Sequence, residues 1–427
     1  MQVYNYTPVF QKTELENGVR VVTENHPLTR SSAVGVFATI GTRDEEQAIA
    51  GATHFLEHLV FKGTKNRSAY EISKALEAVG GDLNAYTTRE YTCFHATSLR
   101  EHMPLGLDIV TDLVTSAKLT PSDFKKEREV IMQEIEMSKD DFEEYISDLF
   151  QEHVYKGHSL GTPILGTPES LKAMKRSDIH RYYKRHYRGS QIIVSVAGNV
   201  SHDEVVAWVK KSMLKMKAKR SSKSRSAPKF KKFQEFIHRP SEQVHLLLGW
   251  PSCSFQSEHR FESYIVNAVL GGGMTSRLYQ RVREKRGLVY SIYSYLQSFV
   301  DGGLFHVYAG ASNKNALQVM KLIKEEMEKF VNRSMRVNEL EMYKTQVKGQ
   351  ILLGAEDMEN RMNSLAVNEM VFGEYRPVES VIEEIDKVTV KSVREFVRKY
   401  LDLNKTSVMV MGDLTAKEAL PLLEVFE

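Results

Sequence analysis

The sequence predicts an α+β fold of two tandem homologous domains, each a mixed sheet with helices packed on it. The strand-like segment Ile192–Val200 (IIVSVAGNV) is echoed by Thr406–Leu414 (TSVMVMGDL), about half a chain length later. A self-similar period this long indicates two copies of one domain rather than a solenoid. Within each copy, strands and helices come in runs instead of strict alternation, which is typical of the α+β class.

The length supports the same division, because 427 residues exceed one ordinary core. We expect a first domain over 1–214, a basic linker over 215–240 and a second domain over 241–427. Lys215–Lys232 contains nine Lys or Arg residues and no acid, a composition that cannot bury a core. A nucleic-acid or acidic-membrane patch is the alternative, but Phe230 is its one aromatic residue.

Composition narrows the class of protein. The apolar fraction of 42% and the charged fraction of 26% are those of a soluble globular chain. A net charge of +3 gives no argument for a nucleic-acid partner, and no apolar run approaches the length of a membrane span. Met1–Thr7 resembles neither a signal peptide nor a transit peptide. Cys93 and Cys253 form no disulfide framework, so a cytoplasmic location is expected.

The first chemically informative element is Gly51–Thr64, an apolar, helix-compatible segment carrying His54, Glu57 and His58 as HxxEH. Histidines four apart share a helix face, with roughly 5–6 Å between their Cβ atoms, so both imidazoles can reach one metal ion. Glu57 lies on that face and can hold a water beside the ion. HxxEH is the signature of inverted zinc peptidases, whose zinc lowers the pKa of its water toward about 7.

Two further elements follow in the first half. Gly80–Thr92 predicts an edge strand after a glycine turn, with a plain hairpin as the alternative. Glu127–Lys139 predicts a helix, because Val130, Ile131 and Ile135 form an apolar stripe. Glu127 and Glu134 are seven apart and lie beside that stripe. Carboxylates next to a core are costly unless paired or bound to a metal.

The repeat continues through the rest of the chain. A basic, aromatic helix is expected before each echoed strand, over 178–187 and 392–401. The second copy has no histidine in Tyr264–Gly273, so one zinc site per chain is expected. Its triple glycine lacks a phosphate-loop signature, and a helix-entry turn is the preferred interpretation.

With these motifs in place, the chain resembles the pitrilysin/insulysin-type inverzincin metallopeptidases, and specifically their processing-peptidase branch. In that family HxxEH is paired with a Glu about 76 residues later, and Glu134 follows His58 by 76 positions within EREVIMQE. The resemblance extends from ENGVRVVTE at 16–24 to the last strand. It implies that His54, His58 and Glu134 bind one Zn²⁺, that Glu57 is the general base, and that Glu127 orients a ligand histidine.

The resemblance also implies substrate-binding residues. Arg283 and Tyr290 match a pair that reaches the substrate carbonyl from the metal-free domain, where both can donate toward an oxyanion. Asn84 and Ala85 would align an extended peptide by strand addition. Glu144 and Asp148, four apart on a continued helix, match an acidic pair that binds an arginine before the cleavage site. A solvated acidic face is the alternative for that pair.

The function expected from the resemblance is a zinc endopeptidase that cleaves unfolded or extended peptides, including Arg-containing presequence-like ones. The two domains would face each other across a cavity. A homodimer or a heterodimer with a related chain is expected, since the branch often works as a dimer. The main alternative is a noncatalytic core or partner subunit with the same fold, although such subunits typically lack one or more of these site residues.

Overall fold

The structure is a computed structural model that describes residues 8–218 and 225–427. It divides the chain into two compact units. Unit 1 comprises 1–137, 162–225 and 353–376, and unit 2 comprises 138–161, 226–352 and 377–427. Residues 1–7, and residues 219–224 of the expected linker, lie outside the described part.

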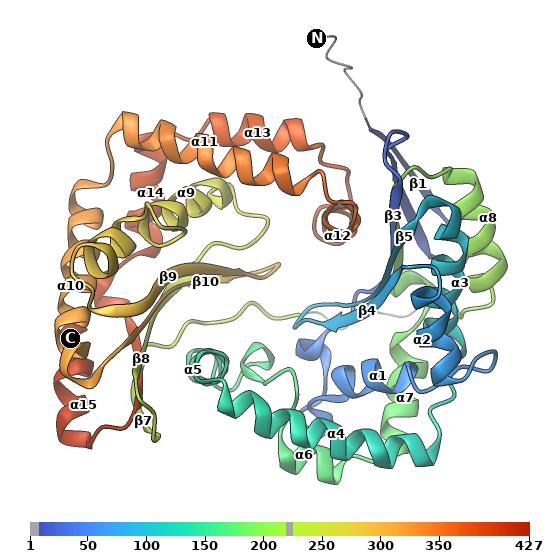
Figure 1. Ribbon diagram of the computed structural model, residues 1–427, viewed down its shortest axis with the longest axis horizontal. Helices are drawn as coiled ribbons and strands as arrows, with labels where there is room; N and C mark the ends of the chain where they lie inside the picture. Colours follow the sequence, from blue (N-terminus) through green and yellow to red (C-terminus); the bar gives the residue numbers. More distant parts are fainter. Residues whose placement is uncertain (1–7, 219–224) are drawn as a thin grey trace. The chain divides into compact units, whose positions relative to one another are not determined.

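Unit 1 is built on a six-stranded sheet of order β1-β2-β6-β3-β5-β4 (Figure 1). Its strands are β1 (Val9–Glu14), β2 (Arg20–Asn25), β3 (Ser31–Ala38), β4 (Asp82–Thr87), β5 (Thr92–Leu99) and β6 (Ile192–Gly198). Its helices are α1 (Ala52–Val60), α2 (Ala69–Glu77), α3 (Met103–Ser116), most of α4 (Pro121–Asp140), α6 (Pro168–Ala173), α7 (Arg176–His186), α8 (His202–Met213) and α12 (Met358–Val371).

Unit 2 repeats the plan with a five-stranded sheet of order β7-β11-β8-β10-β9. Its strands are β7 (Gln234–His238), β8 (Val244–Ser252), β9 (Val289–Ser298), β10 (Gly303–Ala311) and β11 (Ser407–Gly412). Its helices are α5 (Phe142–Val154), α9 (Arg260–Leu270), α10 (Asn313–Arg333), most of α11 (Val337–Gly354), α13 (Val378–Asp386), α14 (Val390–Tyr400) and α15 (Ala416–Leu423), and residues Tyr279–Glu284 form a π-helix.

The two sheets confirm the predicted duplication. If β1 is left aside, β2-β6-β3-β5-β4 and β7-β11-β8-β10-β9 have the same order. The directions also agree, since β2–β6 and β7–β11 are parallel and the other corresponding pairs are antiparallel. The predicted α+β class, with helices packed on mixed sheets, is therefore confirmed.

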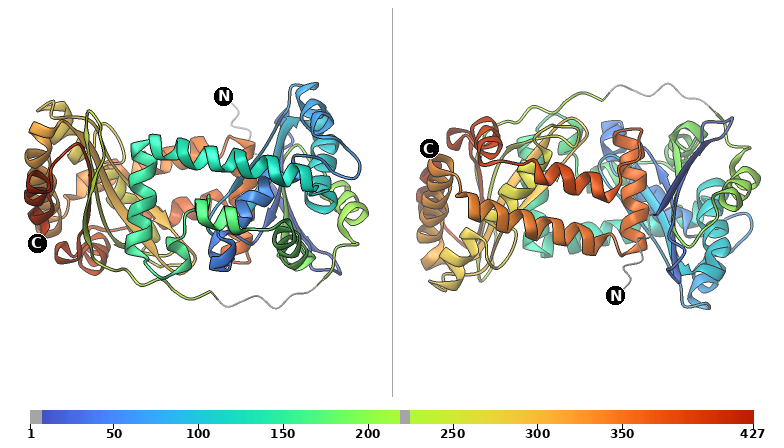
Figure 2. Two further views of the ribbon diagram at one scale, coloured as in Figure 1. Left: turned by 90° about the horizontal axis from the view of Figure 1, so that it is seen from below. Right: turned by 90° about the horizontal axis from the view of Figure 1, so that it is seen from above.

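Each unit takes one helix from the other half of the sequence. In unit 1, α3 and α8 cover one face of the sheet and α12 covers the opposite face (Figures 1 and 2). There Met362 and Leu365 pack against Phe37 and Ile193. In unit 2, α5 covers one sheet face through Phe150 and its neighbours. The units therefore differ from the contiguous segments 1–214 and 241–427, because each exchanged helix buries an apolar face of the sheet it covers.

The expected linker 215–240 is also shorter than predicted. Residues 234–238 form β7, which pairs in parallel with β11. Arg225 makes an ion pair of 2.6 Å with Asp44 and donates to the Glu90 carbonyl at 2.8 Å. The basic composition of the segment did not predict these contacts, because strand pairing and ion pairing depend on partners far away in the chain.

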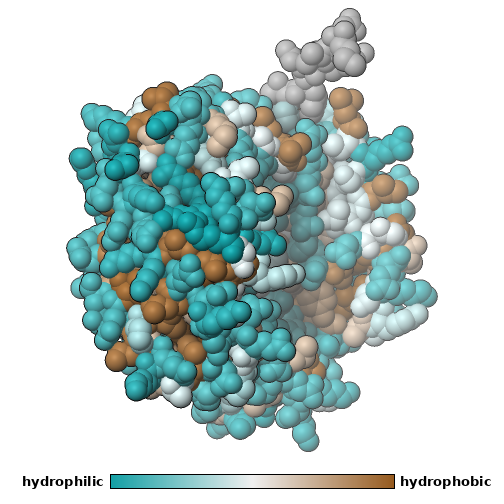
Figure 3. Space-filling model, turned by 60° about the vertical axis from the view of Figure 1, so that its left-hand side comes forward, coloured by the Kyte–Doolittle hydropathy of each residue, from teal (hydrophilic) through white to brown (hydrophobic). Residues whose placement is uncertain are grey.

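Hydrophilic side chains dominate the face seen in Figure 3, with small hydrophobic patches between them. Within the described ranges, no helix combines the length and the apolar character needed to span a membrane.

Candidate metal centre

Gly51 immediately precedes helix α1 and has a positive φ of 89°. A Cβ there would come within 2.7 Å of the Leu165 carbonyl oxygen, so both the backbone conformation and the space favour glycine. The buried Glu45 carboxylate accepts hydrogen bonds from the N–H groups of Gly51 and Thr53, at 2.8 and 2.7 Å. These bonds satisfy N–H groups that a helix leaves free at its start. Burial raises the pKa of Glu45 to about 7.

Helix α1 is held by its apolar face. Phe55, Leu56 and Leu59 are buried in the main core of unit 1. The helix therefore presents its HxxEH residues on one side, with His54 buried and both Glu57 and His58 half-buried. Because apolar and polar residues occupy different faces of the helix, packing of the apolar face fixes the direction in which the polar side chains point.

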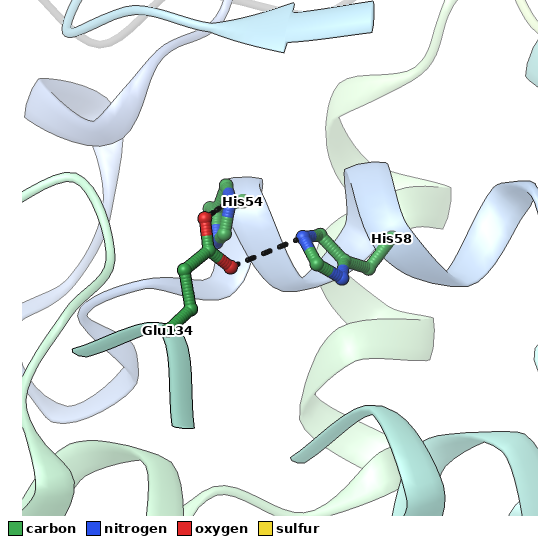
Figure 4. A group of neighbouring side chains, drawn as sticks. All are labelled: His54, His58 and Glu134. Carbon is green, nitrogen blue, oxygen red and sulfur yellow. Dashed lines mark ion pairs between the residues drawn. The ribbon is translucent and has the colours of Figure 1, made fainter. Parts of the chain in front are cut away.

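Helix α4 brings Glu134 to the two histidines. The chain there is anchored by the buried Ile131 and Ile135. These are two of the three residues of the predicted apolar stripe, whereas the third, Val130, is 43% exposed. Figure 4 shows the side chains of His54, His58 and Glu134 pointing toward one another from the two helices. Their potential ligand atoms all lie within 4.8 Å of one another, and among the residues described they are the one such group of three.

The distances suit a shared ion. His54 Nε2 lies 3.6 Å from Glu134 Oε1, and His58 Nε2 lies 3.4 Å from Glu134 Oε2. Ligands about 2.0–2.2 Å from a tetrahedral zinc are separated from each other by roughly 3.4 Å. Two imidazole nitrogens and a carboxylate are also a donor set that catalytic zinc uses. The residues present therefore fit a zinc ion.

The protonation state of His54 agrees with this use. Burial, together with the nearby His58, lowers the pKa of His54 to about 3, which keeps its imidazole neutral and its lone pair available. Burial raises the pKa of Glu134 above its ordinary value. The Nδ1 atom of His54 is buried without a hydrogen-bond partner in the described chain.

Glu127 contacts His58. The sequence predicted that Glu127 and Glu134 lie on nearly the same face of one helix. Glu127 Oε2 is 3.3 Å from His58 Nδ1, and its Oε1 is 3.1 Å from Lys62 Nζ. A proton on Nδ1 directed at Glu127 leaves Nε2 of His58 as the free lone pair on the side of Glu134.

Glu57 is anchored by β4. Thr87 Oγ1 donates a hydrogen bond of 2.5 Å to Glu57 Oε2. Burial raises the pKa of Glu57, while the Thr87 hydrogen bond opposes that rise. Thr87 had no sequence signal of its own; its role depends on β4 ending beside α1. Lys62 was missed because its partner, Glu127, lies on the distant helix α4. Glu45 caps the start of α1 from a loop and had no sequence signal either.

Asn84 and Ala85 lie on β4, which pairs with β5 and ends the sheet order. The prediction of an edge strand following a glycine turn is thus confirmed, since Gly80 has a φ of 70° just before it. The Ala85 N–H donates to Asn84 Oδ1 at 2.8 Å.

The remaining predicted residues belong to unit 2. Arg283 lies in a π-helix rather than an α-helix, an irregularity that often marks functional segments. Its Nη1 donates to Tyr279 Oη at 2.7 Å, and its guanidinium lies 5.9 Å from the centre of the Tyr290 ring. Tyr290 is 79% exposed on β9.

Glu144 and Asp148 share one helix, but it is not the continuation of the metal-binding helix that we expected. Helix α4 ends at Asp140, and Asp141 begins α5 by accepting from the N–H groups of Glu143 and Glu144, both at 3.0 Å. An Asp at this position favours a new helix start, because its carboxylate competes with helix continuation.

Two family models match consecutive segments of the chain. Residues 20–168 match the family described as insulinase (peptidase family M16), and residues 173–347 match the peptidase M16 inactive domain. An uncharacterized zinc protease of Streptomyces coelicolor is 39% identical, covering 96% of this chain and 91% of that protein. One from Bacillus subtilis is 36% identical, covering 90% and 94%.

Solved structures agree in fold. A protease from Helicobacter pylori superposes with a TM-score of 0.86 at 23% identity, covering 95% of this chain and 100% of that one. A structure from Pseudomonas fluorescens, described as a peptidase M16 inactive domain, gives a TM-score of 0.88 at 17% identity, covering 96% and 98%. At these identities the likeness concerns the fold alone.

Proposed function

The chain belongs to the insulinase-type peptidase family M16, and from that premise we propose that it is a zinc endopeptidase hydrolysing unfolded or extended peptides. The observation that carries the proposal is the convergence of His54, His58 and Glu134, with Glu57 on the same helix face. Relatives that share more than a third of its residues over nearly the whole chain are named zinc proteases.

In this proposal His54 Nε2, His58 Nε2 and Glu134 hold one Zn²⁺, and Glu127 orients His58. When bound, zinc supplies Lewis acidity and lowers the pKa of an attached water toward about 7. Glu57 accepts a proton from the attacking water and returns it to the amine nitrogen that leaves when the peptide bond breaks. Thr87 holds one oxygen of Glu57, so the other oxygen would accept the proton from the water.

The substrate would be held as an added strand. β4 offers an edge next to Glu57, where the backbone around Asn84 and Ala85 can pair with an extended peptide. Arg283 and Tyr290 are proposed to donate to the scissile carbonyl as negative charge develops on it. Glu144 and Asp148 are proposed to favour an arginine near the cut. A dimeric, cytoplasmic protein remains our prediction.

The proposal is tested with an Arg-containing, presequence-like fluorogenic peptide and two proteins, the wild type and Glu57→Gln, with bound zinc quantified in both. We expect cleavage by the wild type alone and one zinc per chain in both proteins. Replacing Glu144 and Asp148 together should slow the cleavage of Arg-containing peptides more than that of Arg-free peptides.

Other outcomes have definite meanings. Zinc without cleavage of any Arg-containing or Arg-free peptide would contradict an autonomous peptidase and favour the noncatalytic partner subunit. Absence of zinc from the wild type would contradict the metal centre itself.

A further inference from the structure

The shared strand order allows positions in the two units to be compared. Strand β9 occupies in unit 2 the place that β4 occupies in unit 1. Helix α9 follows β8 as α1 follows β3, and α11 follows α10 as α4 follows α3. The elements that build the metal centre, α1, β4 and α4, therefore correspond to α9, β9 and α11.

Strand pairing carries the comparison to a single residue. When Ala197 of β6 is matched with Met411 of β11, the pairing across β3 and β8 matches Thr97 with Gly310. Five residues earlier on the same strands, Thr92 is matched with Phe305. Thr92 pairs with Thr87, and Phe305 pairs with Leu296. Leu296 thus stands where Thr87, the anchor of Glu57, stands in unit 1.

Unit 2 has a pocket at this position. It has a volume of about 280 Å³ and is lined from α9, β9 and α11. Its apolar lining is formed by Tyr264, Ala268, Leu296, Val347 and Ile351. The elements of unit 2 that correspond to α1, β4 and α4 therefore line a pocket whose side chains are mainly apolar.

Two of the three polar side chains that line this pocket accept hydrogen bonds from neighbouring residues, and the third is Gln350. Asn267 Oδ1 accepts from Ser294 Oγ at 2.8 Å, and the hydroxyl of Tyr264 accepts from Arg260 Nε at 2.8 Å. The lining contains no histidine, carboxylate or cationic side chain. A ligand would consequently gain by burying apolar surface rather than by ionic contact.

Size limits the occupant. Water takes about 30 Å³ of liquid volume, so this pocket corresponds to roughly nine waters. It lies below the range of about 300–1,000 Å³ typical of sites for drug-sized ligands, and it is too small for a helix. One large side chain, aliphatic or aromatic, can enter such a space, since a cavity of about 150 Å³ already holds a benzene ring. An extended peptide presents side chains of this kind individually, because successive residues point to opposite sides.

We propose that the pocket between α9, β9 and α11 binds one large apolar side chain of the peptide substrate. The inference rests on the proposed function and adds a substrate class: extended peptides that carry a leucine, isoleucine, methionine or phenylalanine besides the residues at the scissile bond. Unit 2 would thereby contribute to substrate selection through the elements that correspond to those holding the metal-binding residues in unit 1.

The test measures binding of a fluorescein-labelled, leucine-containing presequence-like peptide to the full chain carrying Glu57→Gln, which prevents turnover. Each leucine of the peptide is replaced by alanine in turn. In the protein, Ile351→Trp fills the pocket, and Leu352→Trp, at the adjacent and 49% exposed position of α11, is the matched control. Leu296→Thr is a second pocket variant on a different element, with the residue found at the equivalent position of unit 1. Cleavage by the protein with Glu57 intact is recorded in parallel.

We expect one leucine position whose replacement weakens binding about tenfold in the Glu57→Gln protein. The same replacement should change binding less than about twofold once Ile351→Trp or Leu296→Thr is present, and still about tenfold with Leu352→Trp. Cleavage by the protein without any leucine position that behaves in this way contradicts the proposed role of the pocket, and it leaves the peptidase proposal standing. If one leucine position behaves in this way but no peptide is cleaved, the result supports the proposed role of the pocket and contradicts the peptidase proposal. Absence of peptide binding overturns both.

Discussion

Thr87 Oγ1, on the last residue of β4, donates a 2.5 Å hydrogen bond to Glu57 Oε2 on α1. The proposed general base is therefore positioned by the same strand that would align the peptide. Hydrogen bonds to charged groups contribute about 1.5–3 kcal/mol, which corresponds to roughly 10- to 100-fold in rate.

We expect Thr87→Val to lower kcat/KM by about 10- to 100-fold while zinc content stays unchanged, because the Glu57 carboxylate loses its orientation. Thr87→Ser keeps a hydroxyl and should retain most of the activity. Steady-state kinetics with parallel zinc analysis checks this. Equal losses in Thr87→Val and Thr87→Ser would show that the hydrogen bond is not the reason.

Glu134→Gln should weaken zinc binding by at least about a hundredfold, because a charged ligand becomes a neutral amide. The matched control is Glu129→Gln, an exposed position of the same helix. Competition with a chromophoric chelator measures both affinities. Indistinguishable affinities for the two variants would remove Glu134 from the ligand set.

Glu127→Gln should weaken zinc binding about 10- to 100-fold, a smaller effect than that of Glu134→Gln, because Glu127 acts through His58 Nδ1 at 3.3 Å. Lys62→Met removes the other partner of Glu127. This variant distinguishes the effect of the Lys62–Glu127 ion pair from that of the Glu127–His58 contact. An affinity unchanged by Glu127→Gln would contradict the orienting role.

The buried Glu45 should make stability depend on pH. Its pKa is raised from 4.5 to about 7 in the folded state, so between these values the unfolded chain releases a proton that the folded chain keeps. The contribution of Glu45 to the free energy of unfolding is therefore fully present below pH 4.5. It falls as the pH rises to about 7 and is constant above.

The measurement is denaturant unfolding of the wild type and Glu45→Gln from pH 4.5 to 8. The free-energy difference between them should shift against the wild type by on the order of 3 kcal/mol across that range. Glu46→Gln, at the exposed neighbouring position, controls for loss of one charge. A difference that is flat with pH would contradict the raised pKa.

Helix α12 should depend on a buried ion pair. Arg361 donates to Glu24 at 2.5 and 3.1 Å, and both residues are buried. Arg361→Ala leaves the Glu24 charge without this partner, and we expect unfolding to become easier by about 3–5 kcal/mol. The double replacement Glu24→Leu/Arg361→Leu removes both charges and should recover most of that loss. Equal destabilisation by the single and double variants would contradict this account.

The sequence by itself determined much of the candidate centre. HxxEH at helical spacing fixed the common face of His54 and His58, because the helix period leaves no other arrangement. The apolar stripe beside Glu134 showed which side of α4 packs inward. The echo of β6 in β11 predicted two copies of one domain, and both sheets have the same strand order.

Tertiary structure decided what these local rules leave open. A periodic apolar stripe indicates that a helix buries one face, but it does not indicate which sheet that face covers. For this reason the exchange of α5 and α12 between the two halves of the chain was not predicted. The same holds for Thr87, whose partner Glu57 lies 30 positions away in the sequence and is chosen by packing. Local chemistry determined which residues can act on a metal, and long-range burial of apolar surface determined which residues meet.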